Sequence, residues 1–191
     1  MSAAADNAPD EHYDTRTVAL HWIVAGLVIA QWLGGKTIDW WPKGPLKVDA
    51  RSMHILFGSA LAIVLAYRIG WRALRGRKFP DGAGRRSLDG ALSSIMHIAL
   101  YATLVTLVGL GLYLEGLRGD SIFGLFHLPQ LGQYPKDARH LLANRATDWH
   151  ALAGNTILIL AGLHFAAALV HQFFRRDTVL RRMVPRWVFG S

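Results

Sequence analysis

The stretch Trp149 to Phe174, WHALAGNTILILAGLHFAAALVHQFF, is apolar and long enough to cross the ~30 Å hydrocarbon layer of a membrane as one α-helix. Two of its three histidines, His150 and His164, are fourteen residues apart. Fourteen helical residues rise about 21 Å and end about 40° short of four full turns. The two imidazoles are therefore predicted to lie on nearly one face of this helix, one towards each side of the membrane, as two stacked haems would require.

Apolar residues make up 52% of the 191-residue chain, and they are concentrated in four runs. Each run is close to the ~20 residues that a membrane-spanning helix needs. The sequence predicts an all-α protein, an integral membrane four-helix bundle with spans at about 17–35, 54–71, 91–115 and 149–174. Residues 1–14 are polar and acidic and are predicted to be a disordered tail, which leaves residues 15–187 as one membrane domain of four transmembrane helices.

The formal net charge is +8, and the basic residues flank the apolar runs instead of alternating with aromatic residues. This arrangement argues against nucleic acid as a partner and for the lipid bilayer. One side of the membrane receives twelve basic residues: Arg16, six within 72–86, and Arg175, Arg176, Arg181, Arg182 and Arg186. The other side receives eight: Lys36, Lys43, Lys47, Arg51, Arg118, Lys136, Arg139 and Arg145. This bias predicts that both termini are cytoplasmic.

The connections between the runs differ in character. Residues 36–53 contain Trp40, Trp41, Pro42 and Pro45 and are expected to form an irregular interfacial loop. Residues 116–148 are longer than a simple connection needs, which is typical of functional or partly structured loops. Within them, SIFGLFHL (121–128) is expected to lie along the membrane surface as a short apolar helix.

The chain has no cysteine, which excludes disulfides, covalently attached c-type haem, iron–sulfur clusters and thiolate catalysis. Any haem must therefore be held by packing and by nitrogen ligands.

Four histidines fall at two matched depths in the predicted spans. His21 is fifteen residues before Lys36 and His164 is fifteen after Trp149, whereas His54 and His150 both lie just inside the other boundary. Ionisable groups are costly in hydrocarbon and so are functional candidates. The first and fourth spans are predicted to clamp one b-type haem through His21 and His164, and the second and fourth another through His54 and His150.

Three further residues have competing interpretations. His97 competes for the inner ligand position, and His171, seven residues after His164, is at the cytoplasmic interface. Each is either a ligand, a neighbour of a quinone or haem propionate, or an ordinary interfacial histidine. Arg68, fourteen residues after His54, either pairs with a haem propionate or extends to lipid phosphate. His12, His127 and His140 are in polar segments and are expected to be exposed.

Glycines inside the spans allow either close helix packing or room for a flat porphyrin. Packing is favoured for Gly109 and Gly111. For Gly58 and Gly154, each four residues after a predicted ligand, both interpretations stay open.

The motifs ALHW around His21, SMHILFG around His54 and DWHALAG around His150, with LHFAAALVHQFF and DTVLRRMVPRW, resemble the bacterial cytochrome b561 family. The resemblance covers about residues 15–187 and implies a multi-pass electron-transfer protein of the bacterial inner membrane with two haems b and ubiquinone as a redox partner. Its four ligands fall on His21 with His164 and on His54 with His150. Some members are superoxide oxidases, which implies an oxidoreductase that passes electrons from a small anion, superoxide, to ubiquinone.

Two other classes of function stay open. One is a haem-bearing membrane anchor that receives electrons from a separate dehydrogenase or a periplasmic protein donor, docked on residues 116–148. The other is a haem-free carrier whose intramembrane His and Arg relay protons or bind a metal. A homodimer also stays open.

Overall fold

The computed structural model describes residues 13–75, 88–175, 180 and 183. Its four long helices are α1 (Thr15–Thr37), α2 (Pro45–Arg75), α3 (Leu88–Arg118) and α4 (Lys136–Val170). The short elements are η1 (Ile38–Trp40), the strands β1 (Ser121–Ile122) and β2 (Phe126–His127), and the π-helical turn η2 (His171–Arg175). Residues 1–12 of the predicted tail lie outside the described residues, as do residues 76–87 and most of the chain after Arg175.

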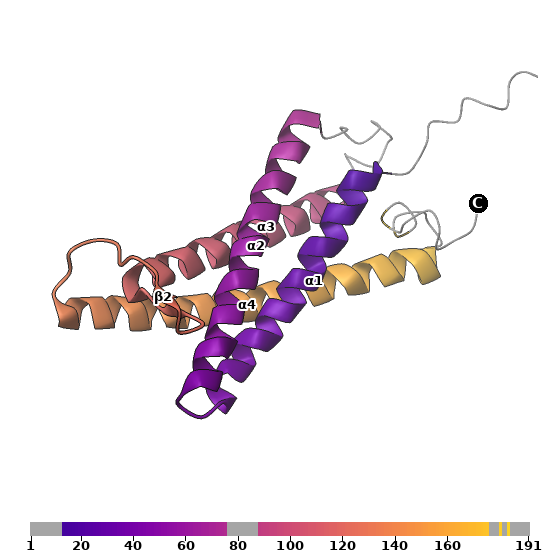
Figure 1. Ribbon diagram of the computed structural model, residues 1–191. Coiled ribbons are helices and arrows are strands. Elements are labelled where there is room, and N and C mark those ends of the chain that lie inside the picture. Colours follow the sequence, from indigo (N-terminus) through magenta and orange to yellow (C-terminus); the bar gives the residue numbers. More distant parts are fainter. Residues whose placement is uncertain (1–12, 76–87, 176–179, 181–182, 184–191) are drawn as a thin grey trace, which may run out of the picture.

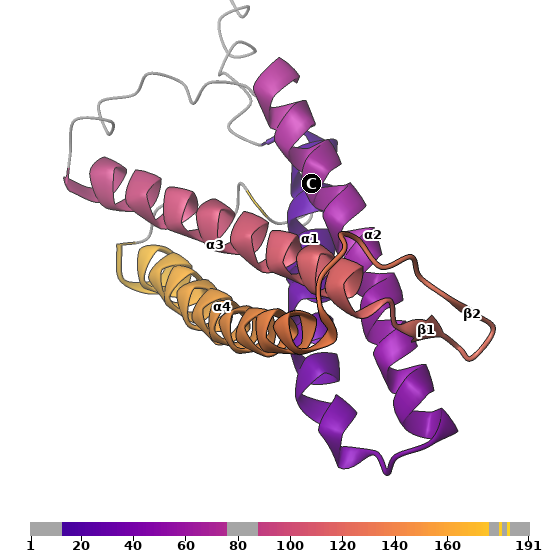
Figure 2. The ribbon, with the colours of Figure 1, turned by 90° about the vertical axis from the view of Figure 1, so that its left-hand side faces the viewer.

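The helices form two antiparallel hairpins, α1 with α2 and α3 with α4, which cross one another steeply (Figure 1). A quarter turn of the view shows α4 against both α3 and α1 (Figure 2). The buried core lies where the hairpins cross, and it is built from Val24, Val28, Leu61, Leu65, Leu104 and Ile157. We call the ends of the helices near Thr37, Pro45, Arg118 and Lys136 the outer end, and the opposite ends the inner end.

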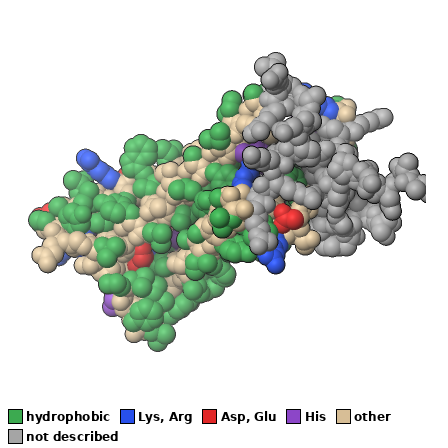
Figure 3. Space-filling view, turned by 90° about the horizontal axis from the view of Figure 1, so that it is seen from above, with side chains coloured by type: hydrophobic (Ala, Val, Ile, Leu, Met, Phe, Trp, Pro, Cys, Tyr) green, Lys and Arg blue, Asp and Glu red, His purple; other side chains and the backbone are tan. Residues whose placement is uncertain are grey.

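All four helices are long and apolar enough to cross a membrane, so the predicted four-helix membrane bundle is confirmed. Large aliphatic side chains point away from the protein, with Ile63, Ile98 and Ile159 between 64% and 70% exposed. Figure 3 shows hydrophobic side chains over most of the described part of one face. Side chains of this kind, left uncovered by the protein, are suited to contact lipid.

The helices extend beyond the apolar runs that predicted them. The prediction of an irregular loop over residues 36–53 was wrong from Pro45 onwards, because α2 begins there, at the first helical position that proline favours. Residues 136–148, assigned to the third connection, are the first turns of α4. At the inner end, Asp14 caps α1 by accepting hydrogen bonds from the Thr17 amide at 3.0 Å and the Thr17 hydroxyl at 2.6 Å.

The segment SIFGLFHL is a two-stranded hairpin, so the prediction of a short surface helix was wrong. Phe123 and Gly124 have φ values of 51° and 70°, a turn conformation that a helix cannot include. Strands β1 and β2 pair Ser121 with His127 and Ile122 with Phe126. The hairpin is attached to α2 by Ser52, whose hydroxyl is fully buried and accepts a hydrogen bond from the Phe123 amide at 2.8 Å.

Candidate functional site

The first histidine pair joins the two hairpins at the outer side of the core. His54 on α2 and His150 on α4 have ring centroids 6.1 Å apart. A metal–imidazole bond is about 2 Å long and the ring centre lies about 1 Å beyond the nitrogen, so two imidazoles on opposite sides of one metal have centroids about 6 Å apart. The spacing of this outer pair therefore fits a shared metal.

The hydrogen bonding of the outer pair leaves nitrogen lone pairs available. The Nδ1 of His150 lies 3.1 Å from the carbonyl oxygen of Leu107. A carbonyl only accepts, so Nδ1 carries the proton and Nε2 keeps its lone pair, the arrangement typical of metal-binding histidines. The Nδ1 of His54 is buried and has no hydrogen-bond partner in the described part of the chain. A buried ring nitrogen of this kind is unusual unless something else completes its surroundings.

Glycines make room for both outer rings. A Cβ atom on Gly35 would lie 3.2 Å from Cε1 of His54, and one on Gly111 would lie 3.1 Å from Cε1 of His150. Gly111, for which ordinary packing was favoured, thus borders a predicted ligand. A Cβ atom on Gly58 would lie 2.8 Å from Nε2 of Gln31, and one on Gly154 would lie 3.9 Å from Cδ1 of Leu107. The glycines closest to the outer rings are therefore not those four residues after the histidines.

The second group of histidines lies on the inner side of the core. The ring centroids of His21 and His164 are 6.4 Å apart, and those of His97 and His164 are 5.2 Å apart. His164 therefore has two imidazole neighbours, one on α1 and one on α3. The spacing of about 6 Å that a shared metal requires is met by His21, whereas His97 is too close to His164 for both rings to bind one metal axially.

Arg68 turns towards this inner group. Its Nη2 lies 3.2 Å from Nδ1 of His21, and its guanidinium lies 5.5 Å from the ring centre of Tyr101. A guanidinium only donates, so Nδ1 of His21 accepts and the proton of the neutral ring lies on Nε2. The inner site thus differs from the outer one. A metal bond at Nε2 of His21 requires the ring proton to move to Nδ1, and Arg68 must then take another partner because Nδ1 no longer accepts.

The remaining histidines have separate surroundings. The Nδ1 of His97 donates to the carbonyl oxygen of Ser93 at 2.7 Å, which leaves its Nε2 as an acceptor. His171 begins η2 and is half-buried, two turns beyond His164. His127 and His140 are exposed, as predicted, while His12 lies outside the described residues.

Polar residues that the sequence interpretation passed over connect the helices near the outer pair. Gln31 on α1 donates to the carbonyl oxygen of His54 at 2.8 Å. Trp32, also on α1, donates to the side-chain oxygen of Asn155 on α4 at 3.1 Å. An amide side chain inside an apolar run is expected to find a partner on a neighbouring helix, so Gln31 and Asn155 were detectable by the reasoning that selected the histidines.

Each pair offers two imidazole nitrogens, which is the complement that a porphyrin iron needs, because the porphyrin supplies the other four. The described residues hold no group of three or more His, Asp or Glu that would bind a metal without such a cofactor. The outer pair, with its orphaned Nδ1 and its glycine neighbours, fits haem directly, and the inner pair fits it once Arg68 is redirected.

Four membrane-spanning helices that bring histidines together in pairs define the class of membrane-bound b-type cytochromes. The family model for prokaryotic cytochrome b561 matches residues 12–186. The chain belongs to the prokaryotic cytochrome b561 family.

Three named relatives align with nearly the whole chain. A probable superoxide oxidase CybB from Yersinia pestis is 27% identical over 176 residues, covering 91% of this chain and 96% of the relative. Cytochrome b561 homolog 1 from Escherichia coli K12 is 26% identical, covering 88% and 94%. Cytochrome b562 from Cereibacter sphaeroides is 24% identical, covering 91% and 96%. The protein is thus a multi-pass protein of the bacterial inner membrane that binds haem b and takes part in electron transfer.

Proposed function

We propose that the protein binds two haems b and carries electrons across the membrane between them. His54 and His150 would hold the outer haem, and His21 and His164 the inner one. The observation that carries this proposal is the ring spacing of 6.1 Å and 6.4 Å in the two pairs, both close to the value for two imidazoles that bind one metal. His97 would be a neighbour of the inner haem and not a ligand.

The apolar core separates the two sites. Leu61 lies between His54 and Arg68 along α2, and Ile157 lies between His150 and His164 along α4. The fourteen-residue separation on α4 corresponds to a rise of about 21 Å. The haem iron supplies the one-electron chemistry, and the side chains position it and set its potential. The buried aliphatic layer excludes water from the space that the electron must cross.

Both termini would be cytoplasmic, so that the outer end faces the periplasm. The support is the excess of basic residues, twelve against eight, on the side that holds the termini. Residues 15–187 would form the single membrane domain, preceded by the acidic tail. In this orientation a periplasmic donor reaches the outer haem first, and a cytoplasmic-side acceptor meets the inner haem.

Superoxide is the proposed donor and ubiquinone the proposed acceptor. The Yersinia relative is named as a probable superoxide oxidase, which supports this donor. A cavity of about 620 Å³ at the outer end supports an anionic substrate, because its lining includes Arg51, Arg118, Lys136 and Arg139 against one carboxylate, Asp120. His97 and His171, on the inner side of the core, are the proposed neighbours of the quinone.

Stopped-flow reduction of the purified ferric protein tests the donor. A superoxide source is expected to reduce the haems faster than the same source does when superoxide dismutase is present. Added ubiquinone is expected to reoxidise them. Ready reduction by ascorbate or quinol without reduction by superoxide would remove superoxide as the donor and leave the electron conduit in place. A colourless, folded preparation would overturn the haem proposal itself.

A further inference from the structure

Two arginines lie one or two helical turns outward of the outer histidine pair. Arg51 precedes His54 by three residues on α2, and Arg118 follows Gly111, the neighbour of His150, by seven residues on α3. Residues three and seven apart lie on nearly the same face of a helix. The two guanidinium groups therefore stand above the outer pair on its outward side.

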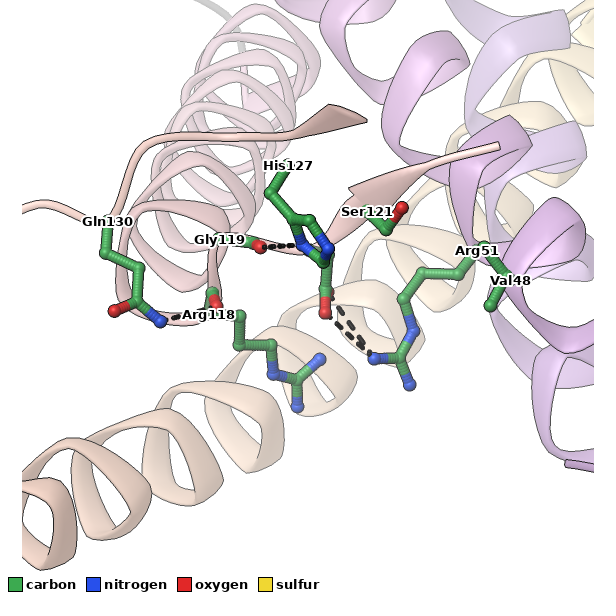
Figure 4. Close-up of a pocket in the computed structure, with 8 residues that line it drawn as sticks. Val48, Arg51, Arg118, Gly119, Ser121, His127 and Gln130 are labelled. Atoms are coloured by element: carbon green, nitrogen blue, oxygen red, sulfur yellow. Dashed lines mark hydrogen bonds and ion pairs between the residues drawn. The ribbon is translucent and has the colours of Figure 1, made fainter. Parts of the chain in front are cut away.

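Both side chains line a cavity of about 460 Å³ beneath the β1–β2 hairpin. Figure 4 shows the guanidinium groups of Arg51 and Arg118 reaching into the same space from α2 and α3, with His127 on its other side. Both arginines also line the neighbouring cavity of about 620 Å³. Two half-buried cations that share a space repel one another unless anions offset them, and the lining of this cavity supplies one carboxylate, Asp120, against the two guanidinium groups.

The existing partners use only part of this binding capacity. Nη1 of Arg51 lies 3.2 Å and 3.4 Å from the two carboxylate oxygens of Asp120. Nη2 of Arg118 donates to the hydroxyl of Thr147 at 2.7 Å, and Thr147 is one turn outward of His150. A guanidinium has five N–H donors, and these contacts involve one nitrogen of each. Among the residues that the structure describes, the other donors have no partner, so they are available for a further carboxylate.

We propose that Arg51 and Arg118 bind the propionate groups of the outer haem. This inference rests on the proposed function and assigns the polar edge of that haem to the outer end. A haem carries two carboxylates, which are costly to bury in hydrocarbon and so turn to the nearest interface. The planar fork of a guanidinium matches a carboxylate, and the two arginines lie where the outward edge of a cofactor between His54 and His150 would emerge.

The binding has two consequences. It would hold the cofactor against rotation between His54 and His150, and it would place positive charge beside the outer iron. A nearby cation favours the more negative reduced state, so it raises the midpoint potential of the outer haem relative to a site without it. A higher potential at the outer haem increases the driving force for its reduction by a donor at the outer end.

The experiment compares Arg118→Gln and Arg51→Gln with wild-type holoprotein in detergent, with excess apomyoglobin as the haem acceptor. Removing one charge-assisted contact is expected to speed loss of the outer haem about tenfold and to lower its midpoint potential, while the inner haem is unchanged. Lys136→Gln is the matched control, because Lys136 lines the larger cavity and carries the same charge. Its rate of outer-haem loss and its outer midpoint potential are expected to equal those of wild type, because it makes no contact with the proposed propionates.

The inner haem reports that each variant is folded, so a loss confined to the outer haem is not a folding defect. If all three proteins contain two haems, and the loss rate and potential of the outer haem are the same in wild type and in both arginine variants, the propionate assignment is overturned. The dihaem proposal would still stand. Equal effects of Lys136→Gln and Arg118→Gln would also overturn it, since a general charge effect would then suffice. Absence of haem from the wild type would overturn both. Malonate in the buffer is expected to leave the wild-type rates unchanged, whereas a rate that rises with malonate would assign the cavity to free carboxylates.

Discussion

His54 and His150 lie on helices of different hairpins, and their imidazole centroids are 6.1 Å apart across the interface between α2 and α4. The interface therefore contains a pair of nitrogen donors in place of the aliphatic contacts that form the core one or two turns further in. Two uncharged imidazoles in an apolar layer contribute little to packing, so their presence there indicates a binding function.

Removal of single histidines should separate the two proposed centres. His54→Ala is expected to abolish the outer haem and His21→Ala the inner haem, so that each variant keeps one haem per protein with one of two redox transitions. His97→Ala is expected to keep both, because its ring is too close to that of His164 to share an axial metal. Haem content and a redox-titrated visible spectrum measure the outcome. Loss of the inner centre in His97→Ala, with retention in His21→Ala, would exchange their roles.

Gly111 should be sensitive to a single methyl group. A Cβ atom there would lie 3.1 Å from Cε1 of His150, so Gly111→Ala displaces the ring by a few tenths of an ångström. We expect about tenfold weaker retention of the outer haem, within the range found when the supports of a metal ligand are altered. Gly109→Ala is the control, since nothing lies within 4 Å of the added atom. Equal haem retention in the two variants would show that the ring tolerates the methyl group.

Much of this arrangement could be predicted from the sequence, because the signals are local. Apolar runs of sufficient length predict the spans, and a spacing of fourteen residues within one run places His150 and His164 at two depths on one face. Depth alone also pairs His54 with His150, the residues that the structure brings together.

Other features depend on how each helix rotates about its own axis, which the sequence pattern does not define. The contact of Arg68 with His21 could not be predicted for this reason. Nor could the finding that Gly111, and not Gly154, borders His150. The polar first turns of α2 and α4 were missed because a search for apolar runs stops at charged residues such as Lys47 and Arg139. The β1–β2 hairpin depends on the positive φ of Phe123 and on its contact with Ser52, which is distant in sequence.

Ser52 should control the attachment of that hairpin. Its hydroxyl lies 2.8 Å from the Val48 carbonyl, 3.2 Å from the Ser121 carbonyl and 2.8 Å from the Phe123 amide. Ser52→Ala leaves the partly buried amide of Phe123 without its acceptor, at a cost of about 1 kcal/mol or more. Chymotryptic cleavage at the exposed Leu125 and Phe126 is expected to become about tenfold faster or more.

Ser59→Ala is the matched control for that experiment, because the Ser59 hydroxyl donates within α2, to the Ile55 carbonyl at 2.9 Å, and has no described contact with the hairpin. Its cleavage rate should equal that of wild type. An unchanged rate in Ser52→Ala would mean that the strand pairing alone holds the hairpin in place.

The contact between Trp32 and Asn155 should contribute to the packing of α1 on α4. The indole N–H donates to the Asn155 side-chain oxygen at 3.1 Å, and α1 and α4 belong to different hairpins. Trp32→Phe removes the donor and keeps most of the ring, while Asn155→Leu removes the acceptor at similar volume. Hydrogen bonds between membrane helices contribute about 0.6–1.7 kcal/mol, so a double-mutant cycle of unfolding in mixed detergent should give a coupling free energy in that range. Additive effects of the two substitutions would show that the bond contributes nothing and that the hairpins are held by the apolar core and by the cofactors between them.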